Sequence, residues 1–88
     1  MKSREVNFSL SALEELQEWN RTMPKLAGKI IELLAECAKT PFTGKGKPEG
    51  LRGDYKGYWS RRINDEHRLV YRVDDNYVYV ASCKGHYD

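Results

Sequence analysis

Arginine side chains in the second half of the chain have the type and spacing that hold a phosphate. Arg62 and Arg68 flank a three-residue turn, and alternation along two extended strands would place both on one face of a hairpin. Two guanidinium groups on one spot repel each other unless an anion lies between them, and phosphate oxygens match the planar arginine fork. The sequence does not fix the register of the turn at residues 64–66, so the pairing depends on how that turn closes.

A carboxylate and an imidazole can add proton transfer to such an anion site. Glu49 follows a proline in a glycine-rich loop, and His86 stands next to Tyr87 near the end of the chain. Taken singly, Glu49 is typical of a solvated acid and His86 of a frayed tail, because chain ends are ordered only where a neighbouring element ties them down. A strand-like run at 77–83 leads directly to His86. His67, in the turn, is expected to be a surface hydrogen-bonding residue without a chemical role.

Positive charge is concentrated in the middle of the chain. Residues 39–72 contain nine Lys and Arg against four acids, a local charge of +5, whereas the whole chain carries +2. Aromatic residues lie among these cations, at Tyr55, Tyr58, Trp59 and Tyr71. This composition favours a polyanion partner with aromatic faces for stacking on bases, and the alternative is a solvated basic sheet face. The candidate RNA-contacting cations are Lys45, Lys47, Arg52 and Arg61.

Length and composition limit the class of protein. Eighty-eight residues are expected to form one domain, 1–88, with a modest core, so an active site must be a surface cleft. No apolar run reaches the roughly 18 residues that a membrane span needs, and nothing near Met1 resembles a signal peptide, so a cytoplasmic location and no membrane partner are expected. Cys37 and Cys83 are expected to be buried reduced thiols. No metal-ligand cluster or phosphate-binding glycine motif is present, so no cofactor is expected.

The first half of the chain predicts a helical hairpin. A short strand at 5–8 precedes a helix that starts at Ser9 or Ser11, where residues 11–14 fit a capping box. The apolar stripe of this helix is expected at Leu10, Leu13, Leu16 and Trp19, followed by a turn at 20–23. Pro24 suits the first turn of a second helix. Its apolar face is expected at Leu26, Ile30, Leu33, Leu34 and Cys37.

The second half predicts a loop followed by strands. Residues 40–57 contain five glycines and two prolines and are expected to form a long irregular loop, which is often a functional feature. Strands at 58–63, 67–73 and 77–83 are separated by turns short enough for an antiparallel meander. The predicted fold class is α+β, a two-helix hairpin packed on one face of a small, mostly antiparallel sheet, with the other face left for basic and aromatic residues.

Four sequence blocks, taken together, closely resemble the YoeB/Txe family of bacterial type II toxins, within the RelE/ParE superfamily. They read TPFTGKGKPE at 40–49, YWSRRI at 58–63, EHRLVY at 66–71 and CKGHY at 83–87. The resemblance covers roughly residues 9–87 and is weaker in the helices. Gly50, Arg52 and the extra Asp88 depart from the usual pattern of that family.

The resemblance implies a RelE-like fold and a ribosome-dependent endoribonuclease that cuts the mRNA codon in the A site without a metal ion. By the family pattern Glu49 matches the general base, Arg68 the transition-state stabiliser and His86 the general acid. Tyr87 matches an aromatic that shapes the site, and Arg62 a second phosphate-facing arginine. These residue types fit metal-free RNA cleavage, which needs a base for the ribose 2′-hydroxyl, a cation for the phosphorane and an acid for the leaving oxygen.

The resemblance also implies partners. A cognate antitoxin of the YefM/Axe type is expected to cover the basic cleft with an acidic and apolar tail, and homodimerisation is consistent with the family. Two other functions remain open at this point. One is a non-catalytic module of the same fold that binds RNA or the ribosome, and the other is a gyrase-directed toxin of the ParE branch, against which the Pro48-Glu49 block and the terminal His-Tyr argue.

Overall fold

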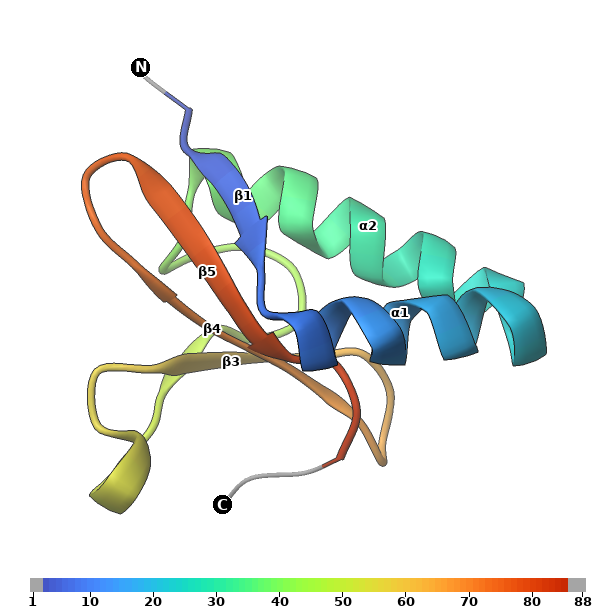
Figure 1. Cartoon of the computed structure of the whole chain (residues 1–88). Helices are drawn as coiled ribbons and strands as arrows, with labels where there is room; N and C mark the ends of the chain where they lie inside the picture. The colour runs from blue at the N-terminus through green and yellow to red at the C-terminus, as the bar shows by residue number, and fades with distance from the viewer. Residues whose placement is uncertain (1–2, 86–88) are drawn as a thin grey trace.

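The computed structural model describes residues 3–85 and contains two helices against one five-stranded sheet (Figure 1). The elements follow the order β1 (Glu5–Phe8), α1 (Leu10–Thr22), α2 (Pro24–Lys39), β2 (Glu49–Gly50), a 3₁₀ turn (Gly53–Tyr55), β3 (Trp59–Arg62), β4 (Arg68–Val73) and β5 (Tyr77–Ser82). Figure 1 shows α1 and α2 on the same side of the sheet. Within residues 3–85, no helix combines the length and apolar character needed to cross a membrane.

The sheet has the strand order β1-β5-β4-β3-β2. The β2-β3, β3-β4 and β4-β5 pairs are antiparallel, and β1 runs parallel to β5. The predicted class, a helical hairpin on a mostly antiparallel sheet, is therefore confirmed. A register shift between Val70 and Tyr71 marks a bulge where β4 pairs with β5.

Helix α1 starts from Ser9, the earlier of the two predicted starts and two residues before the one that the capping box requires. Ser9 is the N-cap, and its hydroxyl accepts a hydrogen bond from the Ala12 backbone N–H at 3.1 Å. The Ser9 N–H in turn donates to the Val80 carbonyl at 3.0 Å. The pairing of β1 with β5 thus fixes the point at which the chain leaves the sheet, so the capping box at 11–14 was wrong. Helix α1 also continues to Thr22, which leaves only Met23 between the helices.

The buried stripe of α1 differs from the predicted one. Leu10 and Leu13 are 72% and 50% exposed, whereas Ala12 and Trp19 are buried. The stripe that faces the core starts at Ala12 and continues through Glu15 and Leu16 to Trp19, which is the i, i+3, i+4, i+7 spacing of a helix face. Small Ala12 allows the helix to lie close to the sheet, and for this reason the larger leucines are turned outward.

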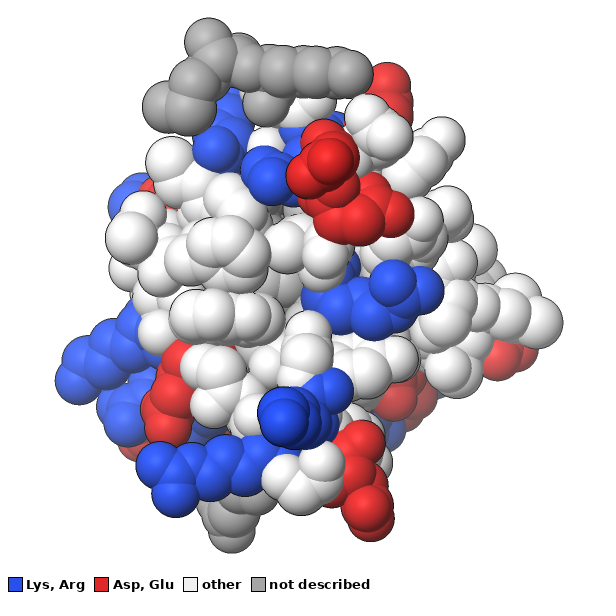
Figure 2. Space-filling model, turned by 90° about the vertical axis from the view of Figure 1, so that its left-hand side faces the viewer, with Lys and Arg blue, Asp and Glu red and all other residues white. Residues whose placement is uncertain are grey.

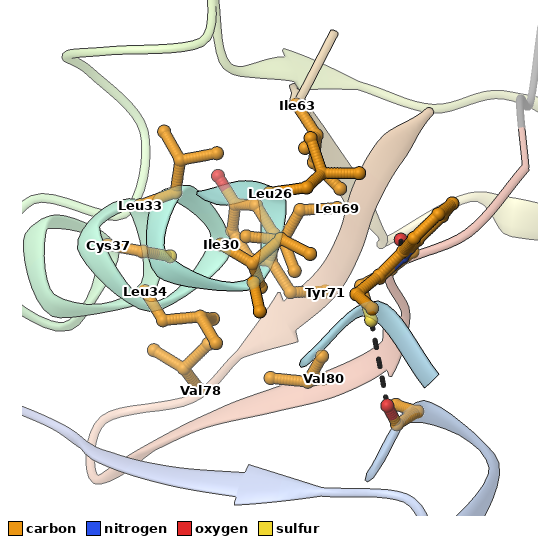
Figure 3. Packing of buried hydrophobic residues seen from close by; sticks show 14 residues of the cluster. Leu26, Ile30, Leu33, Leu34, Cys37, Ile63, Leu69, Tyr71, Val78 and Val80 are labelled. Carbon is orange, nitrogen blue, oxygen red and sulfur yellow. Dashed lines mark hydrogen bonds between the residues drawn. The ribbon is translucent and has the colours of Figure 1, made fainter. Parts of the chain in front are cut away.

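Helix α2 supplies the largest share of the core and does so with the predicted residues. Its apolar face contacts the sheet, as Figure 3 shows for the labelled side chains of α2, β4 and β5. The buried members on this helix are Leu26, Ala27, Ile30, Leu33, Leu34, Cys37 and Ala38. Full burial of an Ile or Leu side chain stabilises the fold by roughly 1.5–3 kcal/mol relative to exposure, so this face holds the helix on the sheet.

Both cysteines are buried and unpaired, as the sequence predicts. Burial raises the pKa of the Cys83 thiol to about 12, and the neighbouring Glu15 carboxylate acts in the same direction. Burial also raises the pKa of Cys37. Because the thiolate is the reactive form, both side chains act as small apolar residues of the core.

Residues 40–57 are mostly loop, but they also contain two short elements that the prediction missed. Glu49 and Gly50 form β2, which pairs with Ser60 and Trp59 of β3. A 3₁₀ turn follows at Gly53–Tyr55. A two-residue strand pairs through its backbone alone and has no side-chain periodicity, so nothing in the sequence indicates it.

Candidate active site

The face of the sheet that points away from the helices carries the polar side chains of three neighbouring strands. Leu69 and Tyr71 of β4 are buried on the helix side, so the alternate residues Arg68 and Arg72 lie on the other face. Figure 2 views the molecule from the left-hand side of Figure 1. It shows most of the Lys and Arg side chains in the lower half, with acidic side chains among them, and a broad uncharged area across the middle.

Arg62 and Arg68 are directly opposite each other on β3 and β4. Directly opposed residues share a face with their Cα atoms roughly 4.5–5.5 Å apart, so the turn closes in the register that places both arginines on one face of the sheet. Arg62 is exposed and Arg68 is half-buried. Two like charges in this position destabilise the pair unless an anion lies between them.

Glu49 joins the same face from β2. It is directly opposite Ser60, and Arg62 follows Ser60 by two residues on β3. Glu49 and Arg62 are therefore diagonal neighbours, with backbones roughly 7–8 Å apart. The exposed Glu49 and the two arginines thus lie on one open face of three neighbouring strands.

Arg68 is oriented by the turn that precedes it. Its Nη1 donates to the Asn64 carbonyl at 2.7 Å and to the His67 carbonyl at 3.2 Å. The Asn64 side chain closes the turn by accepting from the Glu66 and His67 backbone N–H groups at 2.9 and 2.8 Å. Within residues 3–85, the hydrogen bonds of the guanidinium use Nη1 only.

Arg61 lies on the opposite face and is completely buried. Its Nη1 donates to Glu36 Oε1 at 2.8 Å and to the Lys45 carbonyl at 3.0 Å. Its Nη2 donates to the carbonyls of Thr40 and Thr43. With this many bonds inside the protein, the Arg61 guanidinium does not reach the surface, and its prediction as an RNA-contacting cation needs correction: it organises the loop instead.

Glu36 and Tyr71 complete this buried cluster. The Lys45 backbone N–H donates to Glu36 Oε1 at 2.6 Å, and this bond together with Arg61 lowers the pKa of the carboxyl below its ordinary value. Arg61 Nε donates to the Tyr71 hydroxyl at 3.2 Å, and that hydroxyl donates to the Pro41 carbonyl at 2.6 Å. Burial raises the pKa of Tyr71, which stays a neutral donor. The cluster fixes residues 40–45 against β3 and β4.

The loop held in this way carries Lys45 and Lys47 to the edge of the arginine pair. The Arg62 N–H donates to the Gly46 carbonyl at 2.7 Å, and a Cβ on Gly46 would lie 3.0 Å from the Arg62 carbonyl oxygen. Only glycine allows this close approach. Lys45, Lys47 and Arg62 line a surface hollow of about 440 Å³, together with Lys29 and with the acids Glu32 and Asp65.

The remaining predicted residues fall into three groups. Arg52 is exposed just after β2, at the start of the 3₁₀ turn. His86 and Tyr87 lie outside the described residues. Of the aromatics expected to stack on bases, Tyr71 is buried and therefore not available to them, and half-buried Trp59 packs beside the core with its ring 4.7 Å from that of Phe42. Tyr55 is exposed and Tyr58 half-buried.

Two side chains have a structural role near the site: Glu15, which was not predicted, and His67, which was predicted only as a surface hydrogen-bonding residue and is in fact half-buried. Glu15 points from the core-facing stripe of α1 to the end of β5, where it accepts from the Cys83 N–H at 2.8 Å. His67 accepts from the Gly85 N–H at 3.0 Å. A carboxylate on an otherwise apolar helix stripe was a visible signal for Glu15, because such a position needs a hydrogen-bond partner. Nothing comparable marks His67. Within residues 3–85, no group of three or more His, Cys, Asp or Glu side chains is placed to hold a metal ion.

The sequence and the structure of this chain are both similar to those of known proteins. A structure described as a YoeB dimer from Staphylococcus aureus superposes with a TM-score of 0.90 and 45% identity, covering 98% of this chain and all of that one. A heterotetrameric YoeB-YefM toxin-antitoxin complex from the same organism gives a TM-score of 0.87 at 45% identity, over 98% of this chain and all of that one. The protein Toxin YoeB from Mycobacterium bovis is 48% identical over 96% of this chain and 99% of that relative.

The family model for YoeB-like toxins of bacterial type II toxin-antitoxin systems matches residues 8–87. Since the match spans nearly the whole chain and the relatives are close, this chain belongs to that family.

Proposed function

We propose that this chain is the toxin of a two-protein system and acts as a ribosome-dependent endoribonuclease that cuts mRNA in the A-site codon. The observation that carries the proposal is the placement of Glu49, Arg62 and Arg68 on one open face of three neighbouring strands. A carboxylate beside two paired guanidinium groups suits a phosphodiester whose neighbouring hydroxyl must lose a proton.

The proposed reaction starts at the ribose 2′-hydroxyl. Glu49, exposed at the edge of the sheet, takes the proton of this hydroxyl as the oxygen attacks the adjacent phosphorus. Arg68, with Arg62 opposite, neutralises the extra negative charge on the five-coordinate phosphorus. Loss of one such donor typically costs about 10²- to 10³-fold in rate.

His86 completes the reaction in this proposal. It gives a proton to the leaving 5′-oxygen, and Tyr87 shapes the site beside it. The products are a 2′,3′-cyclic phosphate and a 5′-hydroxyl. A positioned acid or base contributes typically ~10²- to 10⁴-fold in rate, so the loss of either Glu49 or His86 is expected to be large.

The substrate is expected to arrive on the ribosome, which holds a single-stranded codon in an extended form that an open sheet face can accept. Lys45 and Lys47 line a hollow next to Arg62, Arg52 is exposed just after β2, and all three contact RNA phosphates in the proposal. Phosphate contacts of this kind weaken as salt rises, because binding releases counterions. The ribosome as target implies a cytoplasmic site of action.

The proposed partners follow from the relatives. The Staphylococcus aureus protein is seen both in a heterotetramer with YefM and as a dimer. For this chain we propose a YefM-like antitoxin that covers the basic side of the sheet with acidic and apolar residues, and a homodimer in its absence.

The test is cleavage in a reconstituted translation system with wild type, Glu49→Gln and Arg68→Gln, followed by analysis of the RNA ends. Glu66→Gln is the matched control, since Glu66 is an exposed acid of the 64–66 turn. The proposal expects a cyclic phosphate and a 5′-hydroxyl, a loss of at least ~100-fold for the two site variants, and wild-type rates for the control. A 3′-hydroxyl with a 5′-phosphate, or full activity of Glu49→Gln, would refute it. Ribosome binding without cleavage would indicate the non-catalytic module instead.

A further inference from the structure

The described chain ends in a segment, Cys83–Gly85, whose backbone is held by side chains from other parts of the molecule. From α1, Glu15 Oε1 accepts from the Cys83 N–H at 2.8 Å, and Trp19 Nε1 donates to the Cys83 carbonyl at 2.9 Å. Both backbone groups of Cys83 are therefore bonded to one helix face.

Gly85 is held in the same way from the start of β4. Its N–H donates to His67 Nδ1 at 3.0 Å, and its carbonyl accepts from the Arg68 N–H at 2.9 Å. Gly85 has a φ of +95°, a conformation that glycine adopts without strain. The backbone bond to Arg68 uses the residue that the proposed function makes the transition-state stabiliser.

The His67 ring is itself fixed. It is half-buried and packs edge-on against Trp19, with ring centroids 4.8 Å apart and an interplanar angle of 64°. To accept from Gly85, Nδ1 must carry a lone pair, so the ring proton of this neutral imidazole is on Nε2. Trp19 therefore supports the segment twice, through its own bond to Cys83 and through the orientation of His67.

We infer that His67 is a positioning residue for the proton donor of the cleavage reaction. The inference rests on the proposed function, in which His86 is the general acid. His86 follows Gly85 directly in the sequence, so the bonds to His67 and Arg68 fix the point from which residue 86 begins. An acid must meet the leaving oxygen accurately, and a misplacement of about 1 Å can cost ~10²-fold in rate. His67 does not touch the substrate in this account.

Two substitutions separate the hydrogen bond from the packing. His67→Phe keeps a ring against Trp19 but has no acceptor for the Gly85 N–H. His67→Asn loses the ring but places an amide oxygen close to the position of Nδ1. If the acceptor is what matters, His67→Phe lowers the single-turnover cleavage rate on programmed ribosomes by about 10-fold at unchanged half-saturating protein concentration. His67→Asn stays within about threefold of wild type on the same grounds.

A combination with His86→Ala shows whether His67 acts through the acid. When the acid is absent its position no longer matters, so adding His67→Phe to His86→Ala is expected to cause no further loss. Amide hydrogen exchange gives a readout independent of activity. His67→Phe should speed exchange at Gly85 and leave Cys83, which is bonded to Glu15, protected as in wild type. His67→Leu, which also has no acceptor for the Gly85 N–H, replaces His67→Phe if that variant fails to fold.

Each outcome decides the matter. An active wild type with a tenfold slower His67→Phe, rescue by His67→Asn and no added loss on His86→Ala supports the inference. Equal rates for wild type and His67→Phe would overturn the inference while the proposed function stands. The same follows if His67→Phe causes as large a loss in the His86→Ala variant as it does in wild type. Absence of cleavage by wild type would remove the proposed function and this inference together.

Discussion

Arg61 and Arg62 are adjacent in the sequence but lie on opposite faces of β3, one completely buried and the other exposed. Arg61 donates to Glu36 and to the carbonyls of the 40–45 loop, whereas Arg62 lies opposite Arg68 on the open face. These two neighbouring arginines therefore have different roles. One holds the loop that carries Lys45 and Lys47, and the other belongs to the candidate active site.

This difference predicts opposite effects of the same substitution. Arg61→Ala leaves three loop carbonyls and Tyr71 without their donor and creates a cavity, so we expect the free energy of unfolding to fall by about 3 kcal/mol or more. Arg62→Ala removes an exposed charge that faces another arginine, and we expect a change within about 0.5 kcal/mol. Urea unfolding at pH 7 measures both. Similar stability of the two variants would contradict the assignment of Arg61 as the loop organiser.

The adjacent arginines also show what the sequence can and cannot predict. Strand alternation places Arg61 and Arg62 on different faces, but it does not say which one is buried, and arginine is almost never fully buried without partners. The partners of Arg61 are backbone carbonyls of a loop and a glutamate 25 residues earlier, and no local pattern connects them. The sequence therefore predicted a surface role for a buried residue.

Other features were predictable for identifiable reasons. The second helix and the three-stranded meander follow from strong periodicities, and the Arg62-Arg68 pairing follows from alternation once the turn at 64–66 is known to close in register. The start of α1 was predicted only as Ser9 or Ser11, and the hydrogen bond from the Ser9 N–H to β5 decides for Ser9. The strand β2 was not predicted because two residues show no side-chain pattern, although this strand places Glu49 in the candidate site.

The Glu36 carboxylate predicts a loss of stability in acid. Its pKa is lowered in the folded protein by the Lys45 N–H and by Arg61, so the stability it contributes is present above the unfolded pKa near 4.5 and is lost as the pH falls through the folded value. Asp74, which caps the turn before β5, acts with the same sign. Wild type should therefore lose stability progressively below about pH 4.5.

Unfolding measurements on Glu36→Gln from pH 7 to pH 3 test whether the Glu36 carboxylate causes this loss of stability in acid. The variant should be less stable than wild type at pH 7, and the difference should shrink as the pH falls, because wild type then loses the same charge. Glu32→Gln is the control, since Glu32 is an exposed acid on the same helix and should leave the pH dependence unchanged. A constant difference between wild type and Glu36→Gln across the range would show that the lowered pKa does not contribute.

The opposed guanidinium groups of Arg62 and Arg68 predict stabilisation by a bound anion. Phosphate between them relieves their repulsion and binds only the folded protein, so it should raise the midpoint of thermal unfolding. Binding at ten times the dissociation constant would add about 1.4 kcal/mol, which corresponds to several degrees for a chain of this size. Chloride at matched ionic strength is the reference, and Arg62→Gln should lose most of the difference. An equal phosphate effect in Arg62→Gln would place the anion elsewhere.

The backbone conformation of Lys47 is expected to lower the stability of the fold, while its side chain is expected to strengthen RNA binding. It is the one non-glycine residue with positive φ in the described part of the chain, at +51°, and such a backbone conformation costs of order 1 kcal/mol. Lys47→Gly should relieve this cost and raise stability by up to about 1 kcal/mol, while it weakens RNA binding through loss of the cation. Lys47→Ala should weaken RNA binding equally without the gain in stability. Equal stability of the two variants would show that the backbone at 47 is not strained.

The central claim is that Glu49 and the arginine pair act on RNA held by the ribosome, with His86 as the acid. Toeprinting of mRNA on programmed ribosomes tests it most directly, with wild type, Glu49→Gln and His86→Ala, and with the same RNA free in solution. We expect cleavage in the A-site codon by wild type, none on free RNA, suppression by a YefM-like antitoxin, and a loss of at least ~100-fold in each variant. The proposed mechanism would be contradicted if wild type did not cleave mRNA on ribosomes, or if both variants cleaved it at the wild-type rate.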